Sequence, residues 1–177
     1  METVFRTSAT EYEALVGRTV DATFQDGGYW HLVVALRCQD GNTISFSTEA
    51  VEIAKYFEVF PIKVEIEQTE QRAWQSLAEP RTIVAVDLLI REEWLEHTIP
   101  HPGHVGSPPH YAQRAGRGPA PDQALEHVVV QAGFQLRFDE GMPIVVFASS
   151  TAPFNVEIAL QSTAIESALA AFNPTEA

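Results

Sequence analysis

The amino-acid sequence predicts an α+β protein that is mostly antiparallel and β-rich, with about eight strands and two or three short helices. Short segments with alternating apolar and polar residues recur along the 177 residues. Two of these segment pairs are separated by an acidic residue and a glycine, Asp40-Gly41 and Glu140-Gly141, as in β-hairpins. Helical periodicity is confined to short segments. We expect residues 1–177 to form a single domain.

The first elements are a short helix and two strands. Residues 9–16 are predicted to be helical, because Ser8–Glu11 has capping-box spacing and Gly17 follows as a stop signal. Residues 18–25 and 29–38 read as strands with a period of two. The second strand is expected to place alternate residues on one face: Trp30, Leu32, Val34, Leu36 and Cys38.

Residues 42–48 form a third predicted strand, and its register follows from the apolar pattern. A two-residue loop would turn Ile44 away from the apolar face. A three-residue loop over residues 39–41 instead pairs Leu36 with Ile44, so the apolar residues of both strands share one face. Such a loop requires Gly41 to adopt a positive φ.

The middle of the chain is less regular. Residues 49–57 are predicted to form one or two helical turns, and residues 58–67 a strand. Residues 69–79 read as a short helix or a loop that Pro80 ends. Residues 82–94 are the most apolar segment and are predicted to be a central strand.

The C-terminal part repeats the pattern of hairpin, strand and helix. Residues 127–139 and 142–149 are predicted to form a second hairpin, in which Gly141 has a positive φ. Residues 154–160 read as a further strand, and residues 163–172 as a closing helix.

The two predicted hairpins match each other at an offset of 100 residues. Two interpretations fit this match. A strand–hairpin–strand unit is duplicated, with half-repeats at 18–67 and 127–160, or two unrelated hairpins with acidic-Gly turns look alike. In both cases alternation predicts partly exposed arginines at positions 37 and 137. The identical pairs are Leu36 and Leu136, Arg37 and Arg137, Gly41 and Gly141, and Ile44 and Ile144.

Four of the six histidines gather around a connection rich in Pro and Gly, residues 98–121. Imidazole is a common metal ligand, so one alternative is a zinc site on this loop. Against it, the chain has one cysteine, no HExxH motif, and prolines that keep the chain extended at about 3 Å per residue. We therefore expect the four side chains not to converge: His97, His101, His104 and His110.

The same connection carries Arg114 and Arg117, and a pair of arginines on a loop can bind a carboxylate or a phosphate. The other interpretation is that acids of the same chain pair with these arginines. The candidate partner-binding residues are His101, His104, His110, Arg114 and Arg117. No phosphate-binding loop and no G-x-S-x-G elbow is found, and Cys38 is predicted to be a core side chain.

The net charge of -13 makes nucleic acid and anionic lipid poor partners, although the charge can also serve solubility alone. The absence of an apolar run near 18 residues argues against a membrane span, and the sequence favours the cytoplasm. The function that we expect is a non-enzymatic acidic module that docks a basic protein, for example a bacterial inhibitor or immunity-type protein. No cofactor is expected.

Two alternatives stay open. One is a metal-binding protein or metal-dependent enzyme that uses zinc in the His97–His110 loop, and the other is a structural subunit whose edge strands pair in an assembly. The oligomeric state does not follow from the sequence.

Overall fold

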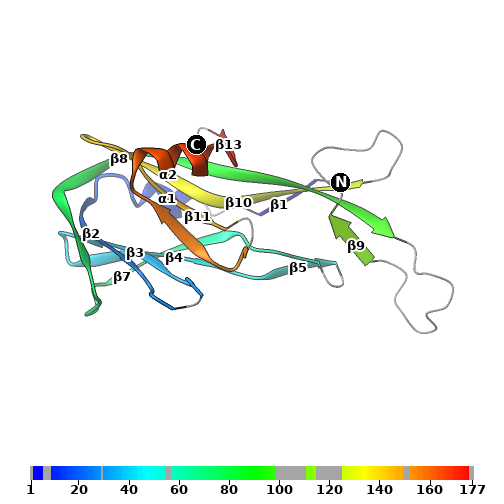
Figure 1. Ribbon diagram of the computed structural model, residues 1–177, viewed down its shortest axis with the longest axis horizontal. Coiled ribbons are helices and arrows are strands. Elements are labelled where there is room, and N and C mark those ends of the chain that lie inside the picture. Colours follow the sequence, from blue (N-terminus) through cyan, green and yellow to red (C-terminus); the bar gives the residue numbers. More distant parts are fainter. Residues whose placement is uncertain are drawn as a thin grey trace.

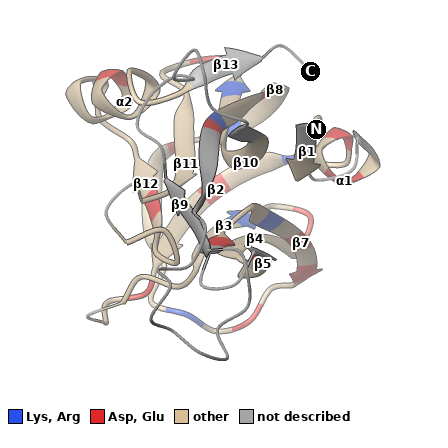
Figure 2. Ribbon diagram, turned by 90° about the vertical axis from the view of Figure 1, so that its right-hand side faces the viewer, with Lys and Arg blue, Asp and Glu red and all other residues tan. Residues whose placement is uncertain are grey.

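Two layers of β-strands pack face to face in the computed structural model, and a helix covers the outer surface of one layer (Figure 1, Figure 2). The predicted architecture, mostly antiparallel and rich in β-strands, is confirmed. The structure describes residues 2–5, 9–28, 30–54, 57–98, 111–114, 125–149 and 152–175.

The described part of the chain contains thirteen strands and two helices. In chain order they are β1 (Glu2–Phe5), α1 (Ala9–Glu13), β2 (Thr19–Gln25), β3 (Val34–Cys38), β4 (Asn42–Thr48), β5 (Val51–Ala54), β6 (Phe57–Val59), β7 (Ile62–Gln68), β8 (Gln75–Thr98), β9 (Tyr111–Arg114), β10 (Leu125–Phe138), β11 (Ile144–Ala148), β12 (Val156–Ala159), α2 (Ser162–Leu169) and β13 (Asn173–Thr175).

The main sheet runs in the order β12-β11-β10-β8-β2-β3-β4-β7. β8 lies at its centre, as the apolar segment 82–94 predicts, and it bends from one layer into the other (Figure 1). β9 and β13 pair with β8 in antiparallel orientation. β1 pairs with β10 in parallel orientation, unlike the other strand pairs described. β5 and β6 form a separate hairpin.

Residues 69–79 were predicted to form a helix or a loop that Pro80 ends. This prediction is wrong for residues 75–79, which belong to a strand. β8 already begins at Gln75 and continues through the proline. It pairs with β2 through Ser76 and again through Arg81, and no pairing is recorded for the residues between them. Because a proline has no N–H to donate, it fits in this unpaired stretch without a lost ladder hydrogen bond.

Both predicted hairpin registers are confirmed. Leu36 pairs with Ile44 in the first hairpin, and Leu136 pairs with Ile144 in the second. The glycine of each turn, at positions 41 and 141, has a φ of 84°. The apolar residues of each hairpin therefore share one face, as the three-residue loop requires.

Replacing Gly41 with valine should lower the free energy of unfolding by about 1–2 kcal/mol, because an L-residue with a side chain is strained at a positive φ. No heavy atom lies within 4 Å of the place that a Cβ atom would occupy, so the backbone conformation alone causes the loss. Urea denaturation measures it. Gly41→Asn is the matched control and should lose much less, since asparagine tolerates this conformation. Equal losses for both variants would contradict this explanation.

The inner faces of the two layers form the main core. The rings of Phe46 and Phe134 meet across the layers with their centroids 5.6 Å apart. Six side chains of β3, β4, β8, β10 and β11 are at most 7% exposed in this core: Leu36, Ile44, Val86, Leu88, Leu136 and Ile144.

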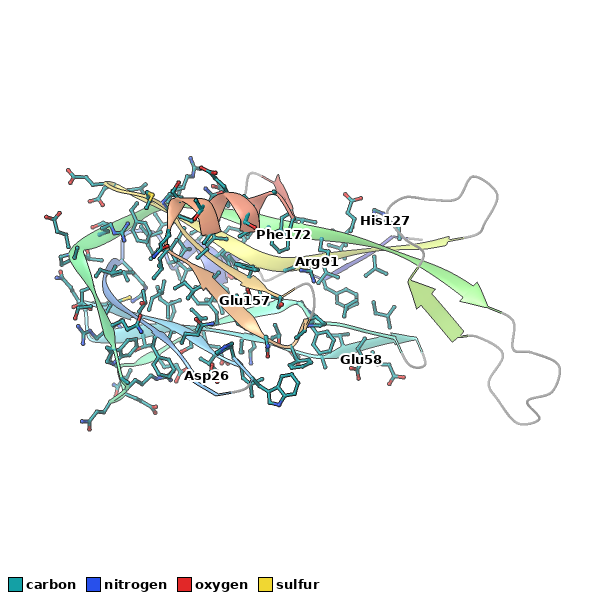
Figure 3. The ribbon with its side chains drawn as sticks, in the orientation of Figure 1. Asp26, Glu58, Arg91, His127, Glu157 and Phe172 are labelled. Carbon is teal, nitrogen blue, oxygen red and sulfur yellow. The ribbon has the colours of Figure 1, made fainter. Side chains whose placement is uncertain are left out.

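A second core cluster lies under α2, on the outer face of the layer that contains β10 and β11. Ile165 and Ala168 of the helix and Phe172 beyond its end are buried there against β8, β10, β11 and β12. The guanidinium of Arg91 lies 5.3 Å from the centroid of the Phe172 ring and donates to the carbonyl of Ala148 (Figure 3). These contacts fix the C-terminal segment to the sheet.

Several predicted elements differ from the structure. Residues 49–57 hold β5 and the start of β6 rather than helical turns, because Val51 and Ile53 alternate with polar residues. The helix predicted over residues 9–16 ends at Glu13 and continues as a turn to Gly17. The connection rich in Pro and Gly, residues 98–121, contains the short strand β9.

Candidate interaction surface

Most of the site residues predicted from sequence lie outside the described residues. This applies to His101, His104, His110 and Arg117. For His97 and Arg114 only the backbone is described, and it lies in the antiparallel pair of β8 and β9. The partner-binding surface and the zinc site on this segment therefore stay predictions. Across the rest of the chain that the structure covers, no three His, Cys, Asp or Glu side chains gather as metal ligands.

The loop between β2 and β3 is the described feature that stands out. It is fixed by the carboxylate of Asp26, whose two oxygens accept hydrogen bonds from the backbone N–H groups of Leu32 and Val33 at 3.1 and 3.2 Å. His31 Nδ1 donates to the carbonyl of Asp26 at 2.6 Å. The carbonyl of His31 in turn accepts from Val156 at the start of β12. Figure 3 labels Asp26 at this loop.

The rings of Trp30, Phe60 and Phe154 cluster beside this loop. Together with Leu32, which is exposed on the same loop, we call these residues the aromatic patch. The rings of Trp30 and Phe154 make an edge-to-face contact with centroids 4.7 Å apart. The ring centroid of Phe60 lies 6.4 Å from that of Phe154, also in an edge-to-face arrangement. Thr48 Oγ1 donates to the carbonyl of Phe154 and so attaches the patch to β4.

Two residues of the aromatic patch are unusually exposed for their size. Trp30 is 48% exposed and Leu32 is 50% exposed. Leaving large apolar side chains in water costs free energy that burial would recover, about 25 cal/mol for each Å². Exposed apolar groups that gather in one place mark interaction sites more often than scattered ones do.

The segments that carry the aromatic patch contain acidic residues. The four segments that build it are 26–33, 48–50, 60–61 and 152–157, and they contain Asp26, Glu49 and Glu157 but no lysine or arginine. The backbone N–H of Glu49 donates to the carbonyl of Pro61, next to Phe60. Figure 2 shows acidic residues on segments of both layers. These segments are therefore acidic in sequence, and the charge of Glu49 also acts on Lys63 of the neighbouring strand β7.

Sequence reasoning missed this surface, because it placed Trp30 and Leu32 on the inward face of a strand over residues 29–38. That prediction is wrong: β3 begins only at Val34. One feature of the sequence could have indicated a loop here. Asp26 precedes two glycines, and an aspartate can accept hydrogen bonds from nearby backbone N–H groups.

The two arginines of the hairpins are partly exposed, as predicted, at 33% for Arg37 and 53% for Arg137. Each forms an ion pair with an aspartate of the neighbouring strand. Arg37 Nε lies 2.7 Å from Asp21, which occupies a bulge in β2, and Arg137 Nε lies 2.9 Å from Asp87. These pairs connect strands on the surface and do not form a buried ligand site.

Cys38 is buried in the main core, which confirms its predicted place. Burial of the thiol, with the charge of Asp40 as a further cause, raises its pKa to about 11. Because the thiolate is the nucleophile, this cysteine is unsuited to nucleophilic chemistry near neutral pH.

No protein-family model, curated protein or solved structure matches the chain. In the part of the chain that the structure describes, no helix combines the length and the apolar character that crossing a membrane requires.

Proposed function

We propose that this protein is a non-enzymatic acidic binding module that docks a basic protein, and that the aromatic patch is its contact surface. The observation that carries the proposal is that Trp30 and Leu32 are about half exposed, while Asp26 accepts hydrogen bonds from the backbone of Leu32 and Val33. A cytoplasmic bacterial inhibitor or immunity-type protein is one concrete version. Nucleic acid is a poor partner, because the net charge of -13 repels phosphate.

Two physical arguments support docking at this surface. Tryptophan is enriched among the residues that contribute most to protein–protein binding, where it is surrounded by weaker contacts that exclude water. A loop that is already ordered also loses less entropy when it binds. The net charge of -13 adds long-range attraction for a basic partner and speeds its association.

The hypothesis of an internal duplication gains support from the strand order. Eight of the eleven strands of this sheet form two groups of four, β2-β3-β4-β7 and β8-β10-β11-β12, which meet where β2 pairs with β8. The side-chain hydroxyls of Thr19 and Thr82 lie 3.0 Å apart at this meeting point. The carbonyl of Thr19 accepts from Gln39, and that of Thr82 accepts from Asp139, at the same place in each hairpin.

The Asp–Arg ion pairs at Arg37 and Arg137 also occur once in each group. The groups share one core, which supports a single domain over residues 1–177. The duplication and the α+β classification stay predictions, and neither changes the proposed function.

The proposal is tested by capture from a lysate of the native host with the immobilised full chain. We expect the wild type to retain a basic protein at low salt and to release it as the ionic strength rises, because screening weakens the attraction. The double variant Trp30→Ala, Leu32→Ser should lose at least about nine-tenths of the captured protein, since truncating a tryptophan hot spot costs about 2 kcal/mol or more.

Met142→Ala is the matched control, because Met142 is 46% exposed at the β10–β11 hairpin and lies outside the patch. It should capture as much partner as the wild type. Equal capture by the wild type and the double variant would contradict docking at the patch. Capture of acidic proteins alone would contradict the predicted charge of the partner.

A further inference from the structure

We propose that the edge strand β7 is a second interaction surface, at which an extended segment of a basic protein adds a strand along residues 64–68. The added segment alternates basic and apolar residues, with a lysine or arginine opposite Glu67 and an apolar side chain opposite Ile66. This surface shares no residue with the aromatic patch, so the inference goes beyond the proposed function and does not depend on it.

The backbone of β7 directs hydrogen-bonding groups away from the sheet at every second residue. The residues that flank β7 both bond toward β4: the carbonyl of Pro61 accepts from Glu49, and the N–H of Thr69 donates to the carbonyl of Gly41. Between them the register of β4 and β7 is unbroken. Because this direction alternates along an antiparallel strand, the odd-numbered residues face β4 and the even-numbered residues face outward.

The outward side of β7 is open in its second half. β7 ends the main sheet, and among the described residues β4 is the only strand that pairs with it (Figure 2). The first half is more crowded, because α1 contacts β7, the charge of Glu11 acts on Lys63, and Ile62 has an interaction of its own. Residues 65–68, in contrast, are all exposed.

The opposite edge of the sheet, β12, is closed by the chain itself. The N–H of Val156 donates to the carbonyl of His31 at 2.6 Å, and the carbonyl of Val156 accepts from Gln25 Nε2 at 3.3 Å. The described residues provide no such groups for the outward backbone of residues 64–68 in β7. An edge with unpaired N–H and carbonyl groups can bind a further strand.

The acids of β7 disfavour a second copy of this chain as that strand. In an antiparallel pair of two copies, Ile66 of one copy could face residue 64, 66 or 68 of the other. In each of these registers a glutamate, at position 65 or 67, lies opposite another glutamate. Like charges directly opposite each other destabilise a sheet, whereas a basic segment avoids this repulsion and is attracted by the net charge of -13.

Glu67 is the side chain that selects a cation. Within the described part of the chain it forms no ion pair, whereas Glu65 lies 2.9 Å from Lys63 Nζ. The odd-numbered residues would form the non-hydrogen-bonded pairs with an added strand, in which opposite side chains come closest. The neighbouring position of that strand faces Ile66, which is 36% exposed, so an apolar side chain there buries it further.

The experiment follows the amide signals of the full ¹⁵N-labelled chain by NMR. The probe is acetyl-Thr-Val-Lys-Val-Lys-Val-Thr-amide, which should shift the signals of Ile66 and Gln68 saturably. Two N-methylated probes form a matched pair. A methyl group on the central valine, whose N–H faces β7, should abolish binding, while one on the preceding lysine, whose N–H points away, should preserve it.

Two further measurements test the hydrogen bonds and the charge. At a probe concentration of about ten times the Kd, the N–H of Ile66 should exchange with solvent about tenfold more slowly, because only the free protein exchanges. Glu67→Gln should lower the affinity by about 1.4-fold to fivefold, the range for a cross-strand ion pair. Glu140→Gln removes the same charge from an exposed turn and should leave the affinity unchanged.

Three results would overturn the inference. Equal affinity for the two N-methylated probes would exclude strand addition, and equal affinity for a probe with glutamine in place of lysine would exclude recognition of a cation. A dimer that protects the Ile66 amide without the probe would assign the edge to a second copy. The double variant Trp30→Ala, Leu32→Ser should bind the probe as the wild type does, so each of these results leaves the proposed function intact.

Discussion

Replacing Phe134 with alanine is expected to lower the free energy of unfolding by about 3–5 kcal/mol, the largest loss that we predict for a single side chain. Phe134 is fully buried, and its ring contacts that of Phe46 in the opposite layer. In β10 it pairs with Leu88 on one side and with Val146 on the other. Removing the ring therefore leaves a cavity where the two layers meet.

Urea denaturation followed by circular dichroism measures this loss as a shift of the midpoint. Small proteins are stable by about 5–15 kcal/mol, so the variant should lose a large share of its stability. The exposed residue Met142 gives the control, and Met142→Ala should change the free energy of unfolding by less than about 0.5 kcal/mol. A loss below about 1.5 kcal/mol for Phe134→Ala would mean that the layers do not depend on this contact.

The second large effect is expected for Gly133→Ala, where one added methyl group should cost about 2–3 kcal/mol. A Cβ atom at this position would lie 2.6 Å from the carbonyl oxygen of Val146 and 2.9 Å from Cβ of Phe147. Both atoms belong to the neighbouring strand β11, so β10 and β11 have to move apart. Gly133 also follows a shift in the register between β10 and β8, which limits how β10 can adjust.

Gly27→Ala is the matched control for this substitution. No heavy atom lies within 4 Å of the Cβ position at Gly27, and its φ is not among the positive values. Its free energy of unfolding should be unchanged or slightly higher, because alanine reduces the entropy of the unfolded chain. Thermal unfolding of both variants under one condition measures the difference. Equal unfolding temperatures for Gly133→Ala and Gly27→Ala would contradict the close approach of β10 and β11 at Gly133.

Local patterns were sufficient for much of the fold. The alternation around Leu36 and Ile44 defined both the loop length and the register, because a slip of one residue would expose every apolar side chain. The same reasoning gave the second hairpin and the positive φ of Gly141. The long apolar run of 82–94 indicated a strand with neighbours on both sides, as β8 has.

Local patterns failed where a contact distant in sequence decided the conformation. Trp30 and Leu32 continue the alternation of β3. However, this segment is held as a loop, because the backbone N–H groups of Leu32 and Val33 donate to the Asp26 carboxylate and that of Val156 donates to the carbonyl of His31. β1 and β13 exist because β10 and β8 offer backbone partners to the ends of the chain. No periodicity within three or four residues can indicate such pairing.

The sequence by itself determined the two hairpins, their glycine turns, the central strand and the acidic charge, because each depends on side-chain alternation or composition along a few residues. Only the tertiary structure decided where β8 crosses between the layers, and that Trp30 and Leu32 face solvent beside Phe154. The physical reason is that an alternating pattern specifies two faces of a strand. Which of them is buried, and where the strand ends, depends on the layers and loops that fold against it.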